Sequence, residues 1–193
     1  MQYEAVVIGV SAGGLMVLSG ILKELPGDYP MPLIVIQHRS KDERTLLEEV
    51  LQDKCVISIR QANEKERIDR SKVYFAPPDY HLLIERDHTF SLTCDDPVNF
   101  SRPSIDLLFE TASEVYKDKL VAVILTGANR DGAEGIRAVR QRGGLTIAQD
   151  PATALFPDMP RAAIDTGSVQ HILNAAKIKD LLLQLAKNRT DHA

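Results

Sequence analysis

Three residues that could act together in hydrolysis each come shortly after an apolar run of the sequence. Ser11 follows residues 5–10, His38 follows residues 32–37, and Asp131 comes a few residues after 120–125. If these runs are parallel strands, their carboxyl ends meet at one edge of a sheet, and the loops that follow them share a rim. A serine, a histidine and an aspartate in contact provide a nucleophile, a general base and a carboxylate that orients the base. The three residues are therefore candidates for a catalytic triad.

The loop around Ser11 has three interpretations. Residues 9–13 read Gly-Val-Ser-Ala-Gly and resemble a nucleophile elbow, the sharp strand-to-helix turn that exposes a serine. A dinucleotide-binding loop is disfavoured, because its middle glycine is missing and the second strand ends in Gln37-His38 instead of an acid. In a third interpretation the glycines only allow a tight turn, and Ser11 caps the following helix. The loop by itself leaves the elbow and the cap open.

Asp131 also has a simpler interpretation, because an acid just before Gly132 could be the N-cap of a helix. Asp106 stands in the first turn of a predicted helix, where the macrodipole explains an acid. The order serine, histidine, aspartate differs from that of the α/β-hydrolase fold, so a triad here would belong to another scaffold. The remaining histidines do not share the rim and are interpreted as structural: His81, His88, His171 and His192.

Short apolar runs alternate with segments of helical spacing, which is typical of an α/β fold. The predicted strands are residues 5–10, 32–37, 56–59, 120–125, 145–148 and 169–172, and a hairpin excursion takes residues 73–76, 81–86 and 90–93. The predicted helices are residues 15–25, 45–51, 103–116, 132–142, 159–166 and 178–185. This pattern predicts one three-layer α/β/α domain over residues 1–193, with a doubly wound, mainly parallel sheet and an antiparallel hairpin.

Bulk properties exclude several classes of function. A net charge of -4 argues against non-specific nucleic-acid binding, which needs a basic face. No apolar run approaches the roughly 20 residues that span a bilayer, and the N-terminus does not read as a secretory signal. Cys55 and Cys94 are far apart and in no metal-ligand spacing. We therefore expect a cytoplasmic protein with two reduced thiols and no membrane insertion.

Blocks spread over nearly the whole chain carry a family resemblance. They are residues 8–14, 35–38, 73–77, 81–83, 102–106, 124–127, 131–133 and 159–164. In this order the blocks resemble the catalytic domain of the CheB chemotaxis receptor methylesterases. The resemblance implies a serine hydrolase with Ser11 as nucleophile, His38 as base and Asp131 as the orienting carboxylate.

The resemblance also implies a substrate and a partner. The reaction would hydrolyse glutamate γ-methyl esters on the cytoplasmic helices of a methyl-accepting chemoreceptor or similar sensor protein, releasing methanol, and some members also deamidate receptor glutamines. No metal or organic cofactor is required. The backbone N–H groups of Ala12 and Gly13, near a helix N-terminus, would meet the oxyanion. The site lining would include Arg102, Ala128 and Met159.

The sequence departs from the family pattern at three places. Ala12 stands where a threonine is usual, Ala128 where a methionine is usual, and Arg39-Ser40 where Met-Pro is usual. These changes bear on rate and substrate preference, and they keep open an alternative, a non-catalytic domain that binds a receptor or sensor. The family's phosphorylatable receiver domain is absent from residues 1–193, which leaves a stand-alone enzyme, a partner of a separate kinase system, or a piece of a longer chain as expectations.

Overall fold

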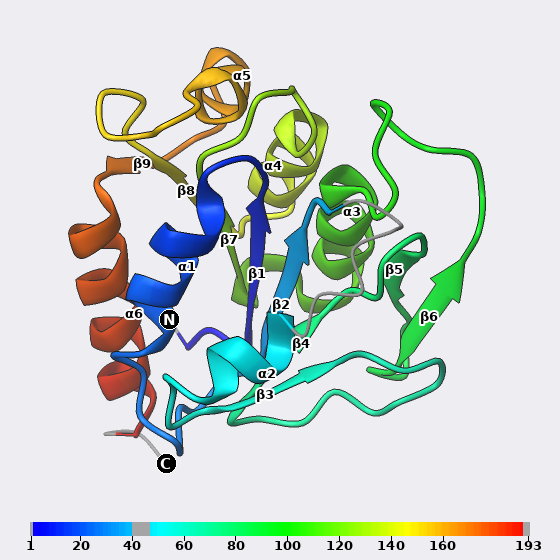
Figure 1. The fold of residues 1–193 in the computed structure, drawn as a ribbon, viewed down its shortest axis with the longest axis vertical. Coiled ribbons are helices and arrows are strands. Elements are labelled where there is room, and N and C mark those ends of the chain that lie inside the picture. Colours follow the sequence, from blue (N-terminus) through cyan, green and yellow to red (C-terminus); the bar gives the residue numbers. More distant parts are fainter. Residues whose placement is uncertain (1, 40–46, 191–193) are drawn as a thin grey trace.

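Seven strands form one parallel sheet at the centre of the computed structural model, which describes residues 2–39 and 47–190 (Figure 1). The order across the sheet is β3-β4-β2-β1-β7-β8-β9, and every neighbouring pair is parallel. The strand bounds are β1 Ala5–Val10, β2 Leu33–Gln37, β3 Ser58–Gln61, β4 Lys72–Phe75, β7 Leu120–Ile124, β8 Leu145–Gln149 and β9 His171–Leu173. This confirms the predicted doubly wound parallel sheet.

Helices cover both faces of the sheet and give it three layers (Figure 1). Alternate residues of β1 point to opposite faces, as the strand pleat requires. Val6 and Ile8 belong to the apolar core under α1, α2 and α6, while Ala5 and Val7 belong to the core under α3, α4 and α5. The helix bounds are α1 Gly14–Leu22, α2 Leu47–Gln52, α3 Ile105–Tyr116, α4 Ala133–Gln141, α5 Asp158–Asp165 and α6 Ala175–Thr190.

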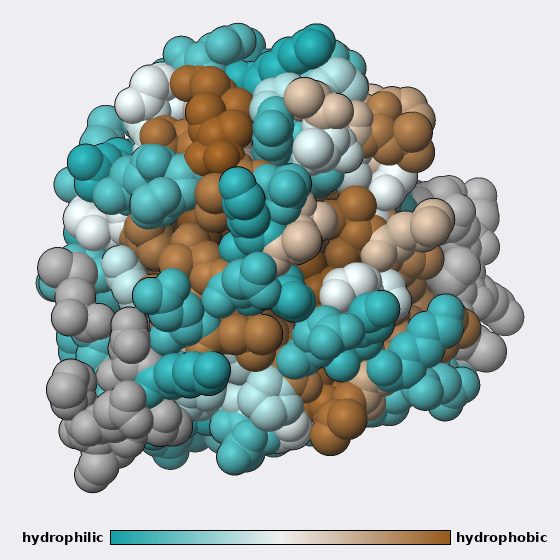
Figure 2. All heavy atoms as spheres, turned by 90° about the vertical axis from the view of Figure 1, so that its left-hand side faces the viewer, coloured by the Kyte–Doolittle hydropathy of each residue, from teal (hydrophilic) through white to brown (hydrophobic). Residues whose placement is uncertain are grey.

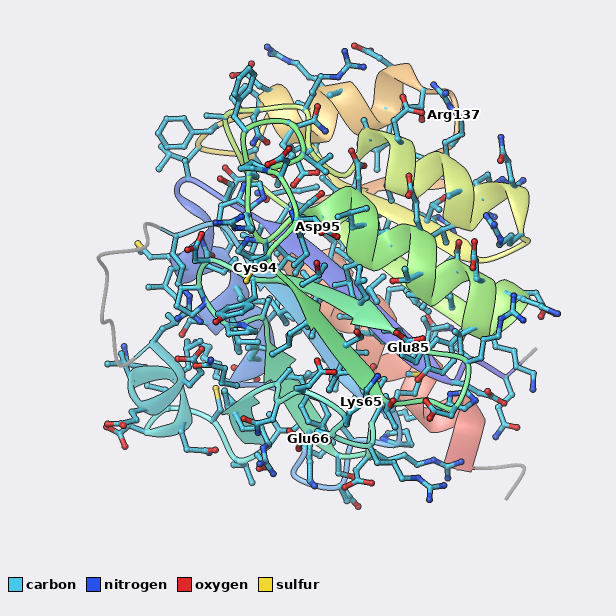
Figure 3. The ribbon with its side chains drawn as sticks, turned by 90° about the vertical axis from the view of Figure 1, so that its right-hand side faces the viewer. Lys65, Glu66, Glu85, Cys94, Asp95 and Arg137 are labelled. Atoms are coloured by element: carbon cyan, nitrogen blue, oxygen red, sulfur yellow. The ribbon has the colours of Figure 1, made fainter. Side chains whose placement is uncertain are left out.

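A separate antiparallel hairpin packs beside α3. It consists of β5 His81–Ile84 and β6 Phe90–Thr93, and it faces the viewer in Figure 3. The prediction that residues 73–76 belong to this hairpin is wrong, because β4 lies between β2 and β3 in the main sheet. Its residues Val73, Tyr74 and Phe75 are fully buried, as expected for a strand covered on both faces.

Element boundaries differ from the predicted ones where local packing decides. The helix predicted from Pro103 begins at Ile105, because Ser104 is its N-cap and accepts a hydrogen bond from Leu107 N at 3.4 Å. The strand predicted from residue 56 begins at Ser58, and the last helix starts earlier, at Ala175. The start of the helix predicted at residues 45–51 lies outside the described residues.

The order in which strands are added to the sheet changes direction at β1. The chain passes from β1 to β2 on one side and returns later to β7 on the other side, so β1 marks the switch point of the sheet. The carboxyl ends of these three strands meet at one rim, at the top of Figure 1. In open parallel sheets this is where ligands bind, and here the loops that carry Ser11, His38 and Asp131 leave the sheet.

The face that carries α1 and α6 shows brown apolar side chains among teal polar ones (Figure 2). α1 contributes Leu15 and Met16 to the surface, and Met16 is 86% exposed. Within residues 2–39 and 47–190, no helix is both long enough and apolar enough to cross a membrane.

Candidate active site

Ser11 lies in the turn between β1 and α1. The N-cap of α1 is Gly13, whose φ of 70° is left-handed, and no side chain caps this helix. The interpretation of Ser11 as a helix cap is therefore wrong. Its backbone N–H donates to Thr126 O at 3.0 Å, and Gly14 N donates to Ser11 O at 3.0 Å. These bonds fix the turn against the loop after β7 and leave the hydroxyl at the rim.

His38 follows β2 and extends its pairing with β1 by one residue, since its backbone N–H donates to Val10 O at 3.0 Å. The side chain reaches both other members of the predicted triad. His38 Nδ1 lies 3.2 Å from Ser11 Oγ, and Nε2 lies 2.8 Å from Asp131 Oδ2. The structure thus brings the three side chains into one hydrogen-bonded chain.

The Asp131 carboxylate is completely buried and accepts hydrogen bonds at both oxygens. Oδ2 accepts from His38 and from Ile105 N at 2.7 Å. Oδ1 accepts from Ser104 Oγ at 3.0 Å and from Asp106 N at 3.1 Å. Burial by itself would raise the pKa of Asp131, but the bonds from His38, Ile105 and Asp106 outweigh it and hold the pKa below its usual range.

These bonds decide which nitrogen of His38 carries the proton. An ionised carboxylate can only accept, so the nitrogen facing Asp131, Nε2, must carry a hydrogen in the neutral ring. Nδ1 is then unprotonated and faces the Ser11 hydroxyl. A base with its free lone pair toward the nucleophile and its N–H toward a carboxylate is the arrangement that activates a serine.

The simpler interpretation of Asp131, as the N-cap of α4, is wrong. The N-cap of α4 is Gly132, with φ 96° and no side-chain cap bond. The carboxylate instead accepts hydrogen bonds from the Ile105 and Asp106 N–H groups in the first turn of α3.

Close backbone approaches hold the nucleophile loop in place. A Cβ added at Gly127 would lie 2.9 Å from Ser11 Cβ and 2.7 Å from Met159 Cε, so this position has room only for glycine. The Gln37 side chain ties two loops together, because Nε2 donates to Ser11 O at 3.3 Å and to His38 O at 3.0 Å. The sequence around Gln37 carries no signal of this bridging role.

The N–H groups of Ala12 and Gly13 stand just before the first turn of α1. Neither donates to an acceptor within residues 2–39 and 47–190. They also lie at the positive end of the helix dipole. Both groups are therefore free to meet a developing negative charge beside Ser11.

The three residues predicted to line the site have different surroundings. Ala128 is exposed in the loop that leads to Asp131. Met159 is 1% exposed and packs behind Gly127. Arg102 is engaged by the hairpin side of the molecule, with Nε and NH2 donating to Asp79 Oδ1 and NH1 donating to Cys94 O and Asp95 O. Figure 3 shows Cys94 and Asp95 near the upper end of the hairpin.

Of the two departures from the family pattern at residues 39 and 40, the structure describes only Arg39. The Arg39 guanidinium is directed to α2 and the end of β4, donating to Glu48 Oε1 at 2.6 Å and to Ala76 O at 3.0 Å. Its side chain is only 5% exposed. Arg39 therefore joins two elements, and its charge is neutralised by Glu48. Ser40 lies outside the described residues.

Two residues in contact with Asp131 were missed or misinterpreted. Ser104 is buried at the N-cap of α3, and a serine before a helical pattern was the available signal. Asp106 was explained by the helix dipole, but its side chain is 4% exposed and accepts from Gly135 N at 2.8 Å and from Asn99 Nδ2 at 2.9 Å. Only the packing of α3 on α4 reveals that contact.

The other histidines lie away from the triad hydrogen-bond chain. His81 is fully buried, with Nδ1 accepting from Ser104 N at 3.1 Å, as expected of a structural residue. His88 lies in the turn after β5 and packs edge-on against Tyr116, and His171 is exposed on β9. His192 lies outside the described residues. Cys55 and Cys94 are free thiols.

Metal-ligating side chains do not cluster in the described part of the chain, where no group of three or more His, Cys, Asp or Glu could hold an ion. The fold and the site together define a doubly wound α/β protein with a serine–histidine–aspartate chain at its switch point.

Comparison with known proteins places this class in a family. The family model described as CheB methylesterase matches residues 6–182. A Leptospira interrogans protein is 50% identical over 191 residues, which are 99% of both chains. A Thermotoga maritima protein named protein-glutamate methylesterase/protein-glutamine glutaminase is 36% identical over 185 residues, 94% of this chain and 54% of that protein.

A solved structure agrees with the sequence matches. The crystal structure of the Thermotoga maritima CheB methylesterase catalytic domain superposes with a TM-score of 0.91 at 34% identity, covering 96% of this chain and all of that one. The chain belongs to the CheB methylesterase family. The resemblance found in the sequence and the expected fold are thereby confirmed.

Proposed function

We propose that this protein is a protein-glutamate methylesterase that uses Ser11, His38 and Asp131 as a catalytic triad. The observation that carries the proposal is the continuous chain of contacts from Ser11 Oγ through the His38 ring to Asp131, at the switch-point rim of the sheet. Membership of the CheB methylesterase family supports the same activity. The names of its relatives add a protein-glutamine glutaminase activity.

In the first half of the reaction, His38 Nδ1 takes the proton from Ser11 Oγ as the oxygen attacks the ester carbonyl. The resulting imidazolium is held between Ser11 and Asp131, whose ionised carboxylate stabilises its charge. The N–H groups of Ala12 and Gly13 donate to the tetrahedral oxyanion. The proton on Nδ1 then passes to the leaving methoxide oxygen, and methanol departs from an acyl-enzyme.

In the second half, His38 Nδ1 removes a proton from water, and the water oxygen attacks the Ser11 ester. The tetrahedral intermediate collapses with the proton returned to Ser11 Oγ, which releases the glutamate side chain as a carboxylic acid that then loses its proton to solvent. With a glutamine side chain, the same steps release ammonia in place of methanol. Every proton that Ser11 Oγ gives up or takes back passes through one imidazole nitrogen.

The substrate we propose is a methylated glutamate on the cytoplasmic helices of a methyl-accepting chemoreceptor or similar sensor protein. This places the enzyme in the cytoplasm, acting without a cofactor and as a single catalytic domain over residues 1–193. Ala12 directly follows Ser11 and Ala128 is exposed in the loop that leads to Asp131, so substrate preference is expected to be set at these two positions.

The test is release of radiolabelled methanol from receptor whose glutamates carry labelled methyl groups. The purified protein is expected to release volatile label in proportion to enzyme and time, and Ser11→Ala is expected to release none. Ammonia release from receptor with glutamine at the same positions tests the second activity. A wild-type protein that binds methylated receptor and releases no label would support the non-catalytic alternative and refute the proposed function.

A further inference from the structure

α3 and α4 cap each other beside the proposed triad. Asp131, one residue before the N-cap of α4, accepts from the N–H groups of Ile105 and Asp106 in the first turn of α3. In return, Asp106 Oδ1 accepts from Gly135 N in the first turn of α4 at 2.8 Å. Each helix thus supplies the carboxylate that satisfies free N–H groups of the other.

Ser104 also contacts Asp131, and His81 in turn holds Ser104 in place. Its hydroxyl donates to Asp131 Oδ1 at 3.0 Å, opposite the oxygen that faces His38. Its backbone N–H donates to Nδ1 of the buried His81 at 3.1 Å, and His81 Nε2 lies 3.2 Å from Asp96 O. The Ser104 side chain is completely buried, so no water competes for the carboxylate.

We propose that Ser104 and Asp106 are positioning residues for the triad, Ser104 by fixing the orientation and charge of Asp131 and Asp106 by anchoring the start of α4 directly behind it. This rests on the proposed function only in assigning Asp131 to the triad. A carboxylate held by four donors has one orientation, and that orientation sets the plane of the His38 ring.

The charged groups around Asp131 contribute to the pH dependence of activity. His38 faces Asp131 from the loop after β2, and Asp106 and Glu110 face it from α3. Glu134, in the first turn of α4, pairs with Arg137 at the surface. Burial and, to a smaller extent, the charge of Asp131 raise the pKa of Asp106 to about 6, although the Gly135 N–H acts in the opposite direction. Asp106 is therefore ionised at neutral pH.

The first test compares Ser104→Ala with the wild type in plateau kcat, KM and the pH dependence of kcat. Loss of one donor leaves the Asp131 charge less neutralised, so the His38 proton is held more tightly and the rising limb moves to higher pH by roughly 0.5. The plateau kcat falls about 10-fold because the ring is less well oriented, and KM stays unchanged. Ser104→Thr, which keeps the hydroxyl, restores both values.

Ser113→Ala is the matched control. Ser113 is a buried serine of the same helix whose hydroxyl donates to Glu110 O, so its loss destabilises the helix without removing a hydrogen bond to Asp131. The proposal for Ser104 is overturned if Ser104→Ala behaves as Ser113→Ala does, in either plateau kcat or the position of the limb. If Ser104→Ala does not fold, Ser104→Gly removes the hydroxyl and keeps a residue that suits an N-cap.

The second test separates the cap made by Asp106 from its charge. Asp106→Asn keeps an oxygen for Gly135 N and is expected to retain most of kcat, whereas Asp106→Ala loses that acceptor and should lower kcat about 10-fold at unchanged KM. Equal rates for the two variants, per folded molecule, would overturn the role of Asp106.

A measurement without turnover separates this inference from the proposed function. The titration of the His38 ring is followed by nuclear magnetic resonance in the wild type and in Ser104→Ala. If the wild type releases no methanol, the proposed function fails, but the His38 midpoint is still expected to move upward in the variant. An unmoved midpoint overturns the inference even when the wild type is a good esterase.

Discussion

Ser11 contributes only its hydroxyl to the chain of contacts at the rim, so replacing it removes chemistry without removing packing. Ser11→Ala is expected to lower kcat by roughly 10⁴-fold or more, as loss of a nucleophile does. The thermal midpoint should change by no more than about 1 °C, because the half-buried hydroxyl fills no core cavity. Methanol release and calorimetry on the same preparation provide both numbers.

Ser19→Ala is the control, since Ser19 is a similarly exposed residue on the next turns of α1. Its activity and midpoint should match those of the wild type. A Ser11→Ala protein that still releases methanol at a normal rate would remove Ser11 from the mechanism.

His38 must be neutral to accept the serine proton, so activity is expected to rise with pH as the ring loses its proton. His38→Gln should abolish this rise together with most of the rate. His171→Gln, at an exposed position on β9, should leave both intact. His81 is unsuitable as a neutral control, because it is buried and accepts from Ser104 N. Profiles of kcat/KM against pH for the three proteins decide the identity of the base.

Asp106 makes the stability of the fold depend on pH. Burial raises its pKa to about 6, above the value of a carboxyl in the unfolded chain. The folded protein therefore holds this proton more tightly, and the free energy of unfolding falls as pH rises from about 4 to about 6, by up to about 3 kcal/mol. Asp131 acts oppositely, since its lowered pKa gives stability that is lost only in stronger acid.

Asp106→Asn cannot ionise and should remove this fall while keeping an acceptor for Gly135 N. Urea unfolding of both proteins between about pH 3.5 and about pH 7, a range that spans the transition, measures the difference. The variant should gain stability over the wild type as pH rises. Parallel curves for the two proteins would mean that Asp106 is not the group that titrates.

At the scale of elements, the turn from β1 into α1 and the loop after β7 approach each other closely at Gly127, which has no side chain. Gly127→Ala would place a Cβ 2.9 Å from Ser11 Cβ and 2.7 Å from Met159 Cε. The Met159 end can move, but Ser11 cannot without leaving His38. We expect a loss of about 1–3 kcal/mol in stability and at least a 10-fold loss of kcat, measured by urea unfolding and methanol release.

Gly20→Ala is the contrasting substitution. Gly20 lies within α1, and a Cβ added there meets nothing within 4 Å. The alanine should stabilise the helix by about 0.5–1 kcal/mol and leave activity unchanged. If both glycine variants behave alike, the close approach at Gly127 does not constrain the site.

At the scale of the whole molecule, the order of strands brings residues from distant parts of the chain together. β1 pairs with β2 on one side and with β7 on the other, so the loops that carry Ser11 and Asp131 become neighbours across 120 positions of sequence. The hairpin and the loop after it lie beside α3, where Arg102 joins Asp79 to the end of β6. The rim is thus built from one edge of the sheet.

The sequence by itself determined the layered parallel fold, the family and the meeting of Ser11, His38 and Asp131. These follow from local signals, because buried strands are short apolar runs and the loops after parallel strands must share an edge. These signals did not predict the sheet to which the strand at residues 73–76 belongs. Its run of apolar residues looks the same in a hairpin and in a sheet, and only its neighbours β2 and β3 decide between them.

Tertiary structure alone decided how Asp131 is held. Its donors Ser104, Ile105 and Asp106 lie 25 to 27 positions away in sequence, and they reach the carboxylate only because α3 and α4 start side by side. The same packing buries Asp106 and raises its pKa. Periodicity predicts which residues of a helix face inward, but the partner that each buried polar group finds depends on the relative placement of two helices, which no local pattern encodes.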